Sequence, residues 1–389
     1  MIFNRCSSNI LQQADVTSHC DGSRFIGNTP RSILTKGTST RRKSRLPGKF
    51  FLRKFDPGNN GKLMTTYRRE PSHNYTFDGT CGVLYQEDMH FFGGINDNLN
   101  DLSRQHFVVE KHRSGERLKR VRMQKLENLN TGLMDPMCST FQLKYEEKSE
   151  NVVILCSSQN YQRSCFVFDN VNLTYIGDSK FKHFMGGLTA YRNKEGFQID
   201  SRWVALSANH SAASNYQFET PSKLLAVGGL NTQKTEIIKR NKYGFLWSTS
   251  NPDFNFVPGR YIIHHSLVTF ESADSNKEYV LLIGGLSDDY VPLKKVFKFD
   301  GEWHQFGELK KPRSMHSSIY WNGMVYVIGG NPRYMLPYNR DFRVNGTKTE
   351  IWNIKDSPGE FKTTDNFPEL LDWIRPHLFV IPDSFFPDH

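Results

Sequence analysis

Short hydrophobic runs separated by polar turns recur along the chain, and most of them end in a pair of glycines. Such pairs close the runs at 93–94, 228–229, 284–285 and 329–330, and a run at 152–157 has Cys156 and Ser157 in their place. Neighbouring pairs lie about 45 to 70 residues apart, a spacing typical of repeated β-units with loops of different length. Runs of this length bounded by turn residues predict β-strands.

The residues on either side of the paired positions also repeat. KTEII at 234–238 and KTEIW at 348–352 are near copies, and VFKFDGEW at 296–303 is a shorter version between them. A basic residue followed by His or a small residue opens a further strand upstream, as in RYIIHHSLVTF at 260–270 and RSMHSSIYW at 313–321. Each unit therefore predicts four strands, lettered a to d, with the glycine pair at the end of strand b, where a Cβ would collide with neighbouring backbone.

This pattern resembles the kelch repeat over residues 75–365. The resemblance implies an all-β fold, a kelch-like β-propeller of four-stranded blades. Six candidates for strand a can be counted, at 80–85, 137–143, 188–191, 266–270, 317–321 and 377–381. Because few residues follow the sixth, its blade would take its other strands from 49–55 and 62–69, so that the N- and C-terminal strands pair and close the ring. We expect six blades, or five or seven if a terminal run is wrongly assigned.

Positive charge is concentrated near the N-terminus. Residues 1–49 carry nine Lys or Arg against Asp15 and Asp21, within a formal net charge of +10 for the whole chain. We expect residues 1–47 to form a basic leader and residues 48–389 the propeller, with nucleic-acid contact restricted to the basic tail at 41–54. No apolar run reaches the roughly 18 residues that a membrane-spanning helix needs. The first residues also lack the apolar core of a secretory signal peptide.

The b-to-c and d-to-a loops of antiparallel blades emerge on one face of a propeller. The longest b-to-c loop, at 331–346, is rich in Tyr and Arg, the residue types that dominate binding hot spots. Basic residues, Lys182 among them, recur just before strand a. There they could hold an acidic partner or brace neighbouring blades through hydrogen bonds to backbone carbonyls. The candidate partner-binding residues are Arg333, Tyr334, Tyr338, Arg340, Arg343, Arg260, Arg313 and Arg375.

Motifs of catalysis are missing from the sequence: it contains no nucleophile elbow, phosphate-binding loop, His-Glu-x-x-His zinc motif or dinucleotide fingerprint. His264 and His265 are adjacent on a predicted strand, so their side chains should point to opposite faces and cannot share one metal ion. Asp288, Asp289 and the scattered glutamates are interpreted as turn or surface residues. We therefore expect no catalytic residue, metal or cofactor, with a propeller-type metal oxidase as the alternative.

The hairpin without glycines contains two cysteines. Cys156 ends one predicted strand and Cys165 opens the next, so they can face each other at a separation that a disulfide accepts. The alternative is a pair of free buried thiols. Cys81 and Cys138 lie on strand a of neighbouring units, which makes a second bridge conceivable. Four sequons for N-glycosylation are present, at Asn74, Asn172, Asn209 and Asn345.

The sequence features that indicate the cellular compartment disagree with one another. Bridged cysteines and sequons favour a secreted protein, whereas the missing signal peptide favours a cytoplasmic or nuclear one. The expected function is that of a non-enzymatic scaffold that binds a protein or glycan partner, acidic in character, through the face of the b-to-c and d-to-a loops. The alternative is an intracellular or nuclear kelch scaffold with a basic tail.

Overall fold

The fold is known from a computed structural model, and its described part is built from strands, turns and bends without an α-helix. Within this part, no helix is long and apolar enough to cross a membrane. The structure describes residues 50–56, 62–69, 79–86, 88–94, 104–109, 123–125, 129–145, 148–191, 223–241, 244–250, 254–271, 277–321, 323–332, 348–356, 358–364 and 377–379.

Five four-stranded antiparallel sheets form five blades, and the strands of each blade follow chain order across the sheet. Blade 1 contains β3 (Thr80–Tyr85), β4 (Asp88–Gly93), β5 (His106–Val109) and β6 (Met123–Lys125). Blade 2 contains β7 (Met137–Tyr145), β8 (Lys148–Cys156), β9 (Ser164–Phe168) and β10 (Leu173–Asp178). Blade 3 contains β11 (Gly187–Tyr191), β12 (Lys223–Gly229), β13 (Thr232–Asn241) and β14 (Gly244–Ser250). Blade 4 contains β15 (Ser266–Glu271), β16 (Glu278–Ile283), β17 (Lys295–Phe299) and β18 (Trp303–Glu308). Blade 5 contains β19 (Ser314–Trp321), β20 (Met324–Asn331), β21 (Thr349–Asn353) and β22 (Lys362–Thr364).

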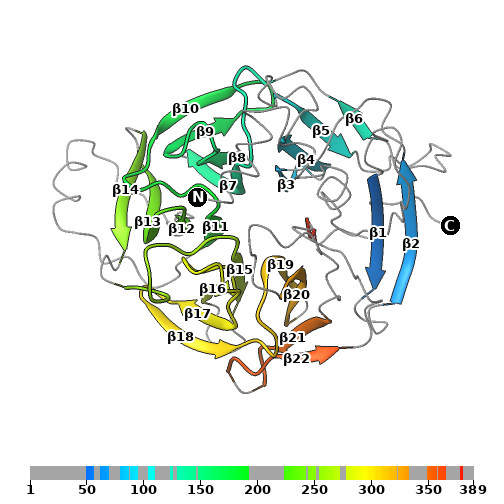
Figure 1. The fold of residues 1–389 in the computed structure, drawn as a ribbon. Coiled ribbons are helices and arrows are strands. Elements are labelled where there is room, and N and C mark those ends of the chain that lie inside the picture. The colour runs from blue at the N-terminus through cyan, green and yellow to red at the C-terminus, as the bar shows by residue number, and fades with distance from the viewer. Residues whose placement is uncertain are drawn as a thin grey trace, which may run out of the picture.

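The blades are arranged around a centre, with the first strand of each blade innermost and the fourth at the rim (Figure 1). The inner strands contact each other in sequence: β3 with β7, β7 with β11, β11 with β15 and β15 with β19. A blade leaves both of its faces apolar, and stacking against neighbours buries them. This arrangement confirms the predicted architecture of an all-β propeller with four-stranded blades.

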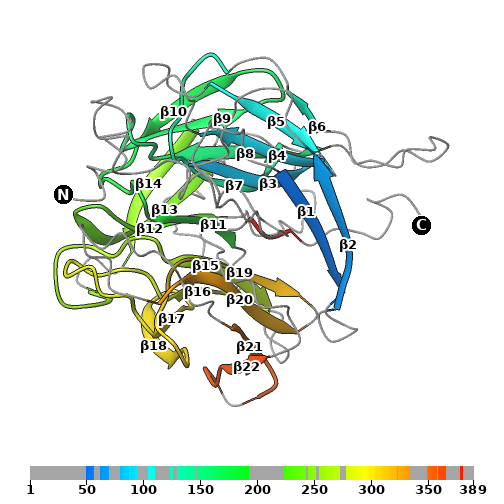
Figure 2. The same cartoon turned by 45° about the vertical axis from the view of Figure 1, so that its right-hand side comes forward.

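The predicted number of six blades is wrong, because the described residues form five, which was the stated alternative. The segments expected to build the sixth are present as separate pieces. β1 (Phe50–Asp56) and β2 (Lys62–Arg69) pair with each other and lie at the rim between blades 1 and 5 (Figure 2). Residues 377–379 contact blade 1, where the His377 and Phe379 rings lie 5.5 and 5.8 Å from that of Phe91, and Leu378 packs with residues of blade 5. Pairing of these terminal pieces with one another is not among the strand pairings described, so ring closure by the two ends stays a prediction.

The glycine pairs connect neighbouring blades. A carbonyl oxygen of the next blade lies where the first glycine would carry its Cβ. It is 2.3 Å from that position at Gly93 (Leu133), 2.7 Å at Gly228 (Ile262) and 2.6 Å at Gly284 (Arg313). The second glycine donates its N–H to the same oxygen, from Gly94 to Leu133, Gly229 to Ile262 and Gly285 to Arg313. A side chain at the first position would displace that oxygen, so glycine is required by contact as well as by its left-handed backbone.

Blade 2 places two serines at the glycine positions. Ser157 has a φ of 54°, close to the 57° of Gly284, and Ser158 follows it. Cys156 pairs with Cys165 across strands β8 and β9, one residue before the left-handed position. Our alignment of Cys156 with the first glycine was therefore one residue too early.

Two disulfides are present, the one that we expected and the one that the sequence only made conceivable. Cys156 and Cys165 are bonded across the β8–β9 hairpin with their Cα atoms 4.1 Å apart, which confirms the predicted bridge. Cys81 on β3 and Cys138 on β7 are also bonded, with a Cα separation of 6.0 Å, so the second bridge joins the inner strands of blades 1 and 2.

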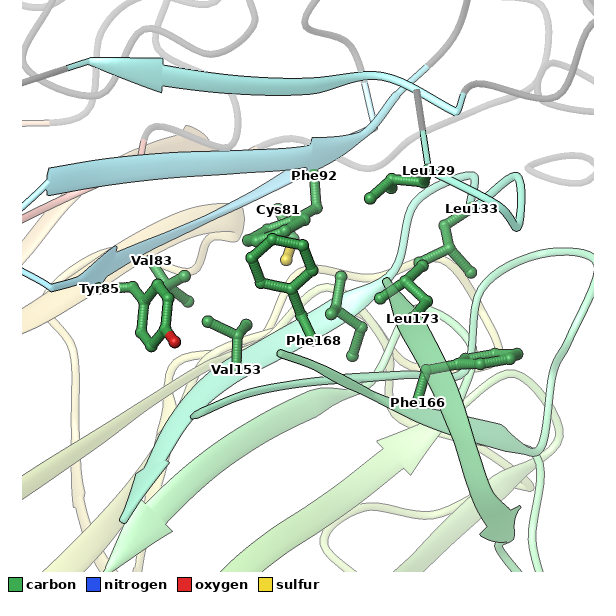
Figure 3. Close-up of a cluster of buried hydrophobic side chains, with 11 residues drawn as sticks. Cys81, Val83, Tyr85, Phe92, Leu129, Leu133, Val153, Phe166, Phe168 and Leu173 are labelled. Atoms are coloured by element: carbon green, nitrogen blue, oxygen red, sulfur yellow. The ribbon is translucent and has the colours of Figure 1, made fainter. Parts of the chain in front are cut away.

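Apolar side chains fill the space between blades 1 and 2 (Figure 3). Phe92 from blade 1 and Phe168 from blade 2 meet edge to face with ring centres 4.9 Å apart. Two buried histidines, His90 and His106, lie beside them with their ring nitrogens 2.9 Å apart. Burial lowers the pKa of His90 to about 4 and that of His106 to about 3. Both imidazole rings at this junction are therefore neutral at pH values above about 4.

Candidate interaction face

The segments that lead from the rim of one blade into strand a of the next lie on the same face as the b-to-c loops. We call them lead-in segments: 179–186 leads into blade 3, 259–265 into blade 4 and 309–313 into blade 5. In each of the three blades, a carboxylate accepts hydrogen bonds from two consecutive main-chain N–H groups of its own lead-in segment.

Blade 3 uses Glu236 of β13, whose carboxylate accepts the N–H groups of Lys180 and Phe181 at 2.9 and 3.0 Å. The Nε2 of His183 also lies 2.9 Å from this carboxylate, and its Nδ1 lies 2.7 Å from the carbonyl oxygen of Gly228. Burial by itself would raise the pKa of Glu236, but the hydrogen bonds from His183 and from the backbone outweigh it and lower the pKa. The glutamate is therefore held in its charged form.

Blade 5 repeats the arrangement with Glu350 of β21 and Arg313. Glu350 accepts the N–H groups of Lys310 and Lys311 at 2.6 and 3.1 Å. The Arg313 guanidinium forms an ion pair with Glu350 and donates to the carbonyl oxygens of Gly329 and Lys348. Burial lowers the pKa of Arg313, and the adjacent carboxylate opposes this shift. Both side chains are fully buried, so loss of either partner would leave an uncompensated charge at a cost of about 3 to 5 kcal/mol.

Blade 4 achieves the same result with an aspartate from its b-to-c loop. Asp288 accepts the N–H groups of Arg260 and Tyr261, both at 2.8 Å, and lies 3.3 Å from Nε of Arg260. The Tyr261 hydroxyl donates to the carbonyl oxygen of Asp288 at 3.3 Å. Burial, reinforced by Tyr290, raises the pKa of Tyr261. The lead-in segment and the b-to-c loop of blade 4 are thus fastened to each other.

These contacts correct our interpretation of Glu236 and Glu350, whereas Asp288 and Asp289 lie in a turn as expected. Glu236 and Glu350 are buried and hold backbone in place, and Asp288 is partly buried and does the same. The signal was present in the near-identical KTEII and KTEIW segments, where a glutamate recurs between Thr and Ile on strand c. We missed it because alternation along a strand does not reveal which polar residue will meet the free N–H groups of a distant turn.

Backbone hydrogen bonds also link one lead-in segment to the next around the centre. The N–H of His264 donates to Met185, and the N–H of Met315 donates to His264, each at 2.9 Å. All three residues have left-handed φ values between 55° and 64°. Asp135 donates in the same way to Gly79, at 2.9 Å. The inner rim of this face is therefore fixed by main-chain contacts, and strained backbone of this kind persists only where its surroundings hold it.

An apolar cluster supports the face from below. Its members come from the lead-in segments of blades 3 and 4 and from the adjoining b-to-c turns. They are Phe184, Met185, Leu230, Tyr261, Ile263 and Leu286, with Tyr290 packed against them.

Exposed basic side chains project from all three fastened segments. Lys180 and Lys182 are exposed before blade 3, Arg260 before blade 4, and Lys310 and Lys311 before blade 5. The Arg260 side chain is 83 % exposed even though it pairs with Asp288. Because the carboxylates hold the main chain, these cations are presented from fixed backbone positions.

The predicted binding residues have different locations. Arg260 is exposed, as a binding residue must be, whereas Arg313 has no exposed surface and its contacts fit the bracing role. The predicted loop residues Arg333, Tyr334, Tyr338, Arg340 and Arg343, together with Arg375, lie outside the described residues.

The histidines before strand a are also buried. His265 lies beside Gly228, whose Cβ position would be 3.0 Å from the imidazole, and His316 is 2.8 Å from that of Gly284. Burial lowers the pKa of His265 to about 3 and that of His316 well below its ordinary value. Among the residues that the structure describes, no group of three or more His, Cys, Asp or Glu side chains could hold a metal ion.

Four-stranded blades around a centre define the chain as a β-propeller. No protein-family model matches the chain. Kelch-like protein 41b of Danio rerio is 25% identical over 145 residues, which is 34% of this chain and 22% of that protein, so the chain matches about a fifth of the relative's length. Among solved structures, that of YjhT aligns with a TM-score of 0.48 and 12% identity over 78% of this chain and 88% of that chain. The blades show a β-propeller, and both the glycine-pair repeats and the sequence match are similar to those of kelch proteins.

Proposed function

We propose that this protein is a non-enzymatic interaction scaffold that binds an acidic protein or glycan through the face of its lead-in segments and b-to-c loops. The observation that carries the proposal is the repeated fastening of exposed cations. Three successive lead-in segments have their backbone held by Glu236, Asp288 and Glu350, and each segment exposes one or two basic side chains. Rigid presentation lowers the ordering cost of binding, and grouped cations favour an acidic partner.

The two disulfides support an oxidising compartment as the place where this scaffold works. Disulfides persist in secreted and extracellular proteins and are rare in the cytosol and the nucleus. A partner met in that setting is a protein or a glycan rather than a nucleic acid.

Charge reversal on the face tests the proposal. The triple variant Lys180→Glu, Arg260→Glu and Lys310→Glu leaves the Lys180 and Lys310 main-chain N–H groups free to bond to the carboxylates, because only side chains change. Binding should be measured on two immobilised acidic probes, heparin and polyglutamate, as the salt concentration that elutes the protein. We expect elution at clearly lower salt than for the unaltered chain, with the melting temperature little changed.

A matched variant separates the face from net charge. Lys239 and Lys355 are exposed near the c-to-d turns, on the opposite face. A variant with Lys239→Glu, Lys355→Glu and Lys362→Glu has the same change of charge and retains the basic leader. Equal loss of binding in the two variants would show that general positive charge, and not this face, holds the acidic probe.

A further inference from the structure

The turn between β9 and β10 of blade 2 is a rigid, exposed hairpin loop. Its backbone is held by Asp169, whose carboxylate oxygen accepts the N–H groups of Val171 and Asn172 at 3.2 and 2.8 Å. The hydrogen bond from Asn172 is the main reason that the pKa of Asp169 is lowered. The N–H of Asp169 donates in turn to the carbonyl oxygen of Asn172, at 3.3 Å. The turn therefore presents Asn172 in one defined position.

Asn172, Leu173 and Thr174 form a sequon whose side chains are sorted by strand alternation. Asn172 and Thr174 are exposed, while Leu173 between them is 4% exposed and packs in the core between blades 1 and 2. Asn130 fixes the middle residue, because its side chain bonds both the N–H and the carbonyl oxygen of Leu173, at 3.2 and 3.0 Å. Since residues two apart on a strand share a face, the amide and the hydroxyl of the sequon both face outward. β10 is the outermost strand of its blade, and both side chains are exposed there.

We propose that Asn172 is an attachment site for an N-linked glycan. The donor would be an oligosaccharide linked to a lipid diphosphate. The side-chain nitrogen of Asn172 forms a bond to C1 of the first sugar, and the bond between C1 and the phosphate oxygen breaks. The electron pair leaves with the lipid diphosphate, and the amide releases one proton. N-glycans are added to Asn-x-Ser/Thr sequons of secreted proteins, and disulfides of the kind seen here form in the same oxidising environment.

The position of the glycan agrees with the proposed binding face but does not depend on it. The turn joins strands c and d, and antiparallel strands place it on the face opposite the lead-in segments. A glycan at Asn172 therefore leaves the fastened cations uncovered. Glycosylation of Asn172 is expected even if the face binds no partner, and a failure of the glycan proposal would not count against the binding face.

The full chain should be expressed in animal cells behind a cleavable secretory leader, and the secreted protein reduced, alkylated and digested with trypsin. The peptide of residues 164–180 carries the sequon. Treatment with peptide N-glycosidase in heavy-oxygen water converts a glycosylated asparagine to labelled aspartate, and fragmentation distinguishes Asn172 from Asn170. We expect the label at Asn172 in most copies of the peptide, its loss in Thr174→Ala and its retention in Thr174→Ser.

A matched turn in blade 4 shows whether the hairpin geometry is accessible to the transferase. β18 has the same alternation of buried and exposed residues as β10, and Glu302 and His304 occupy the places of Asn172 and Thr174. The variant Glu302→Asn with His304→Thr creates a sequon there. An unlabelled Asn172 overturns the proposal, whether the other sequons are labelled or not. If position 302 were labelled in the same protein, the shape of the hairpin could not be the reason that Asn172 is not glycosylated.

Discussion

The junction between blades 2 and 3 differs from the junctions that follow blades 1, 3 and 4. After a glycine pair, the next blade inserts a carbonyl oxygen into the space of the missing Cβ, as Arg313 does at Gly284. After blade 2, the corresponding carbonyl oxygen of His183 accepts the N–H of Gly186 within its own segment, at 2.7 Å. Ser157 carries a Cβ at the position that the inserted carbonyl oxygen crowds at the other junctions. The carbonyl oxygen of His183 therefore bonds to a donor in its own segment instead.

Other bonds stabilise the two segments that meet at the exceptional junction. In blade 4, Ile283 at the end of strand b pairs with Val296 near the start of strand c, and in blade 2 the disulfide between Cys156 and Cys165 takes the place of this pair. The lead-in segment that follows is held by Glu236, as described above. Loss of a repeat signature therefore does not mean loss of the blade. A covalent bond joins strands b and c where the glycine contact is missing, and the carboxylate fastening seen in blades 4 and 5 is kept.

The largest loss of stability is expected when the first glycine of a pair is replaced. Gly284→Ala places a Cβ 2.6 Å from the carbonyl oxygen of Arg313 and puts a side chain on a backbone with a φ of 57°. Left-handed backbone costs a non-glycine residue about 1 kcal/mol and crowding adds about 1 to 3 kcal/mol. We expect the free energy of unfolding, measured by urea titration, to fall by about 3 kcal/mol.

Gly323→Ala is the matched control. Gly323 has a φ of 75°, and the nearest atom to its Cβ position is 4.0 Å away, so the variant incurs the backbone cost without the collision. It should lose about 1 kcal/mol. If the two variants lost the same stability, insertion of the carbonyl oxygen would not be what requires glycine at the pair.

The disulfide should come next in size. Replacing Cys156 and Cys165 together by Ala opens a short loop, whose closure contributes about 2 to 3 kcal/mol. The double variant Cys156→Ile with Cys165→Val instead installs the pair found in blade 4, and it should recover part of that loss through packing. Thermal unfolding of both variants, with intact-mass analysis of the unaltered chain before and after reduction, checks this. Equal melting temperatures for the Ala pair and the unaltered oxidised chain would contradict a stabilising bridge.

Much of the architecture was predictable because it follows from local pattern. The alternation and the glycine pairs located strand a in five blades, and the facing positions of Cys156 and Cys165 located a disulfide. The number of blades was not predictable, because it depends on which terminal runs pair across the ring, and sequence periodicity does not contain long-range pairing. The alignment of Cys156, instead of Ser157, with the first glycine has a similar cause, because only backbone angles distinguish the left-handed position from its neighbour.

The candidate face was harder to predict than the fold. Basic residues before strand a were visible in the sequence, but their roles differ with burial: Arg313 braces the backbone, and Arg260 is exposed. The acceptors that fasten the lead-in segments, Glu236, Glu350 and Asp288, lie 27 to 56 residues from the N–H groups they bind. Such contacts are set by the stacking of strands, so propensity and motif searches do not find them.

The smallest expected effect concerns Ser157 itself. The backbone there has a φ of 54°, which glycine adopts freely, and among the residues that the structure describes the buried Ser157 hydroxyl has no hydrogen-bond partner. Ser157→Gly should therefore raise the free energy of unfolding, by up to about 1 kcal/mol after the greater entropy of glycine in the unfolded chain is counted. Ser157→Ala separates the two causes, because it removes the hydroxyl and keeps the Cβ. A gain with Gly but not with Ala would assign the strain to the backbone, whereas a loss with Gly would show that the serine is a stabilising part of this junction and that the comparison with the glycine pairs has the wrong sign.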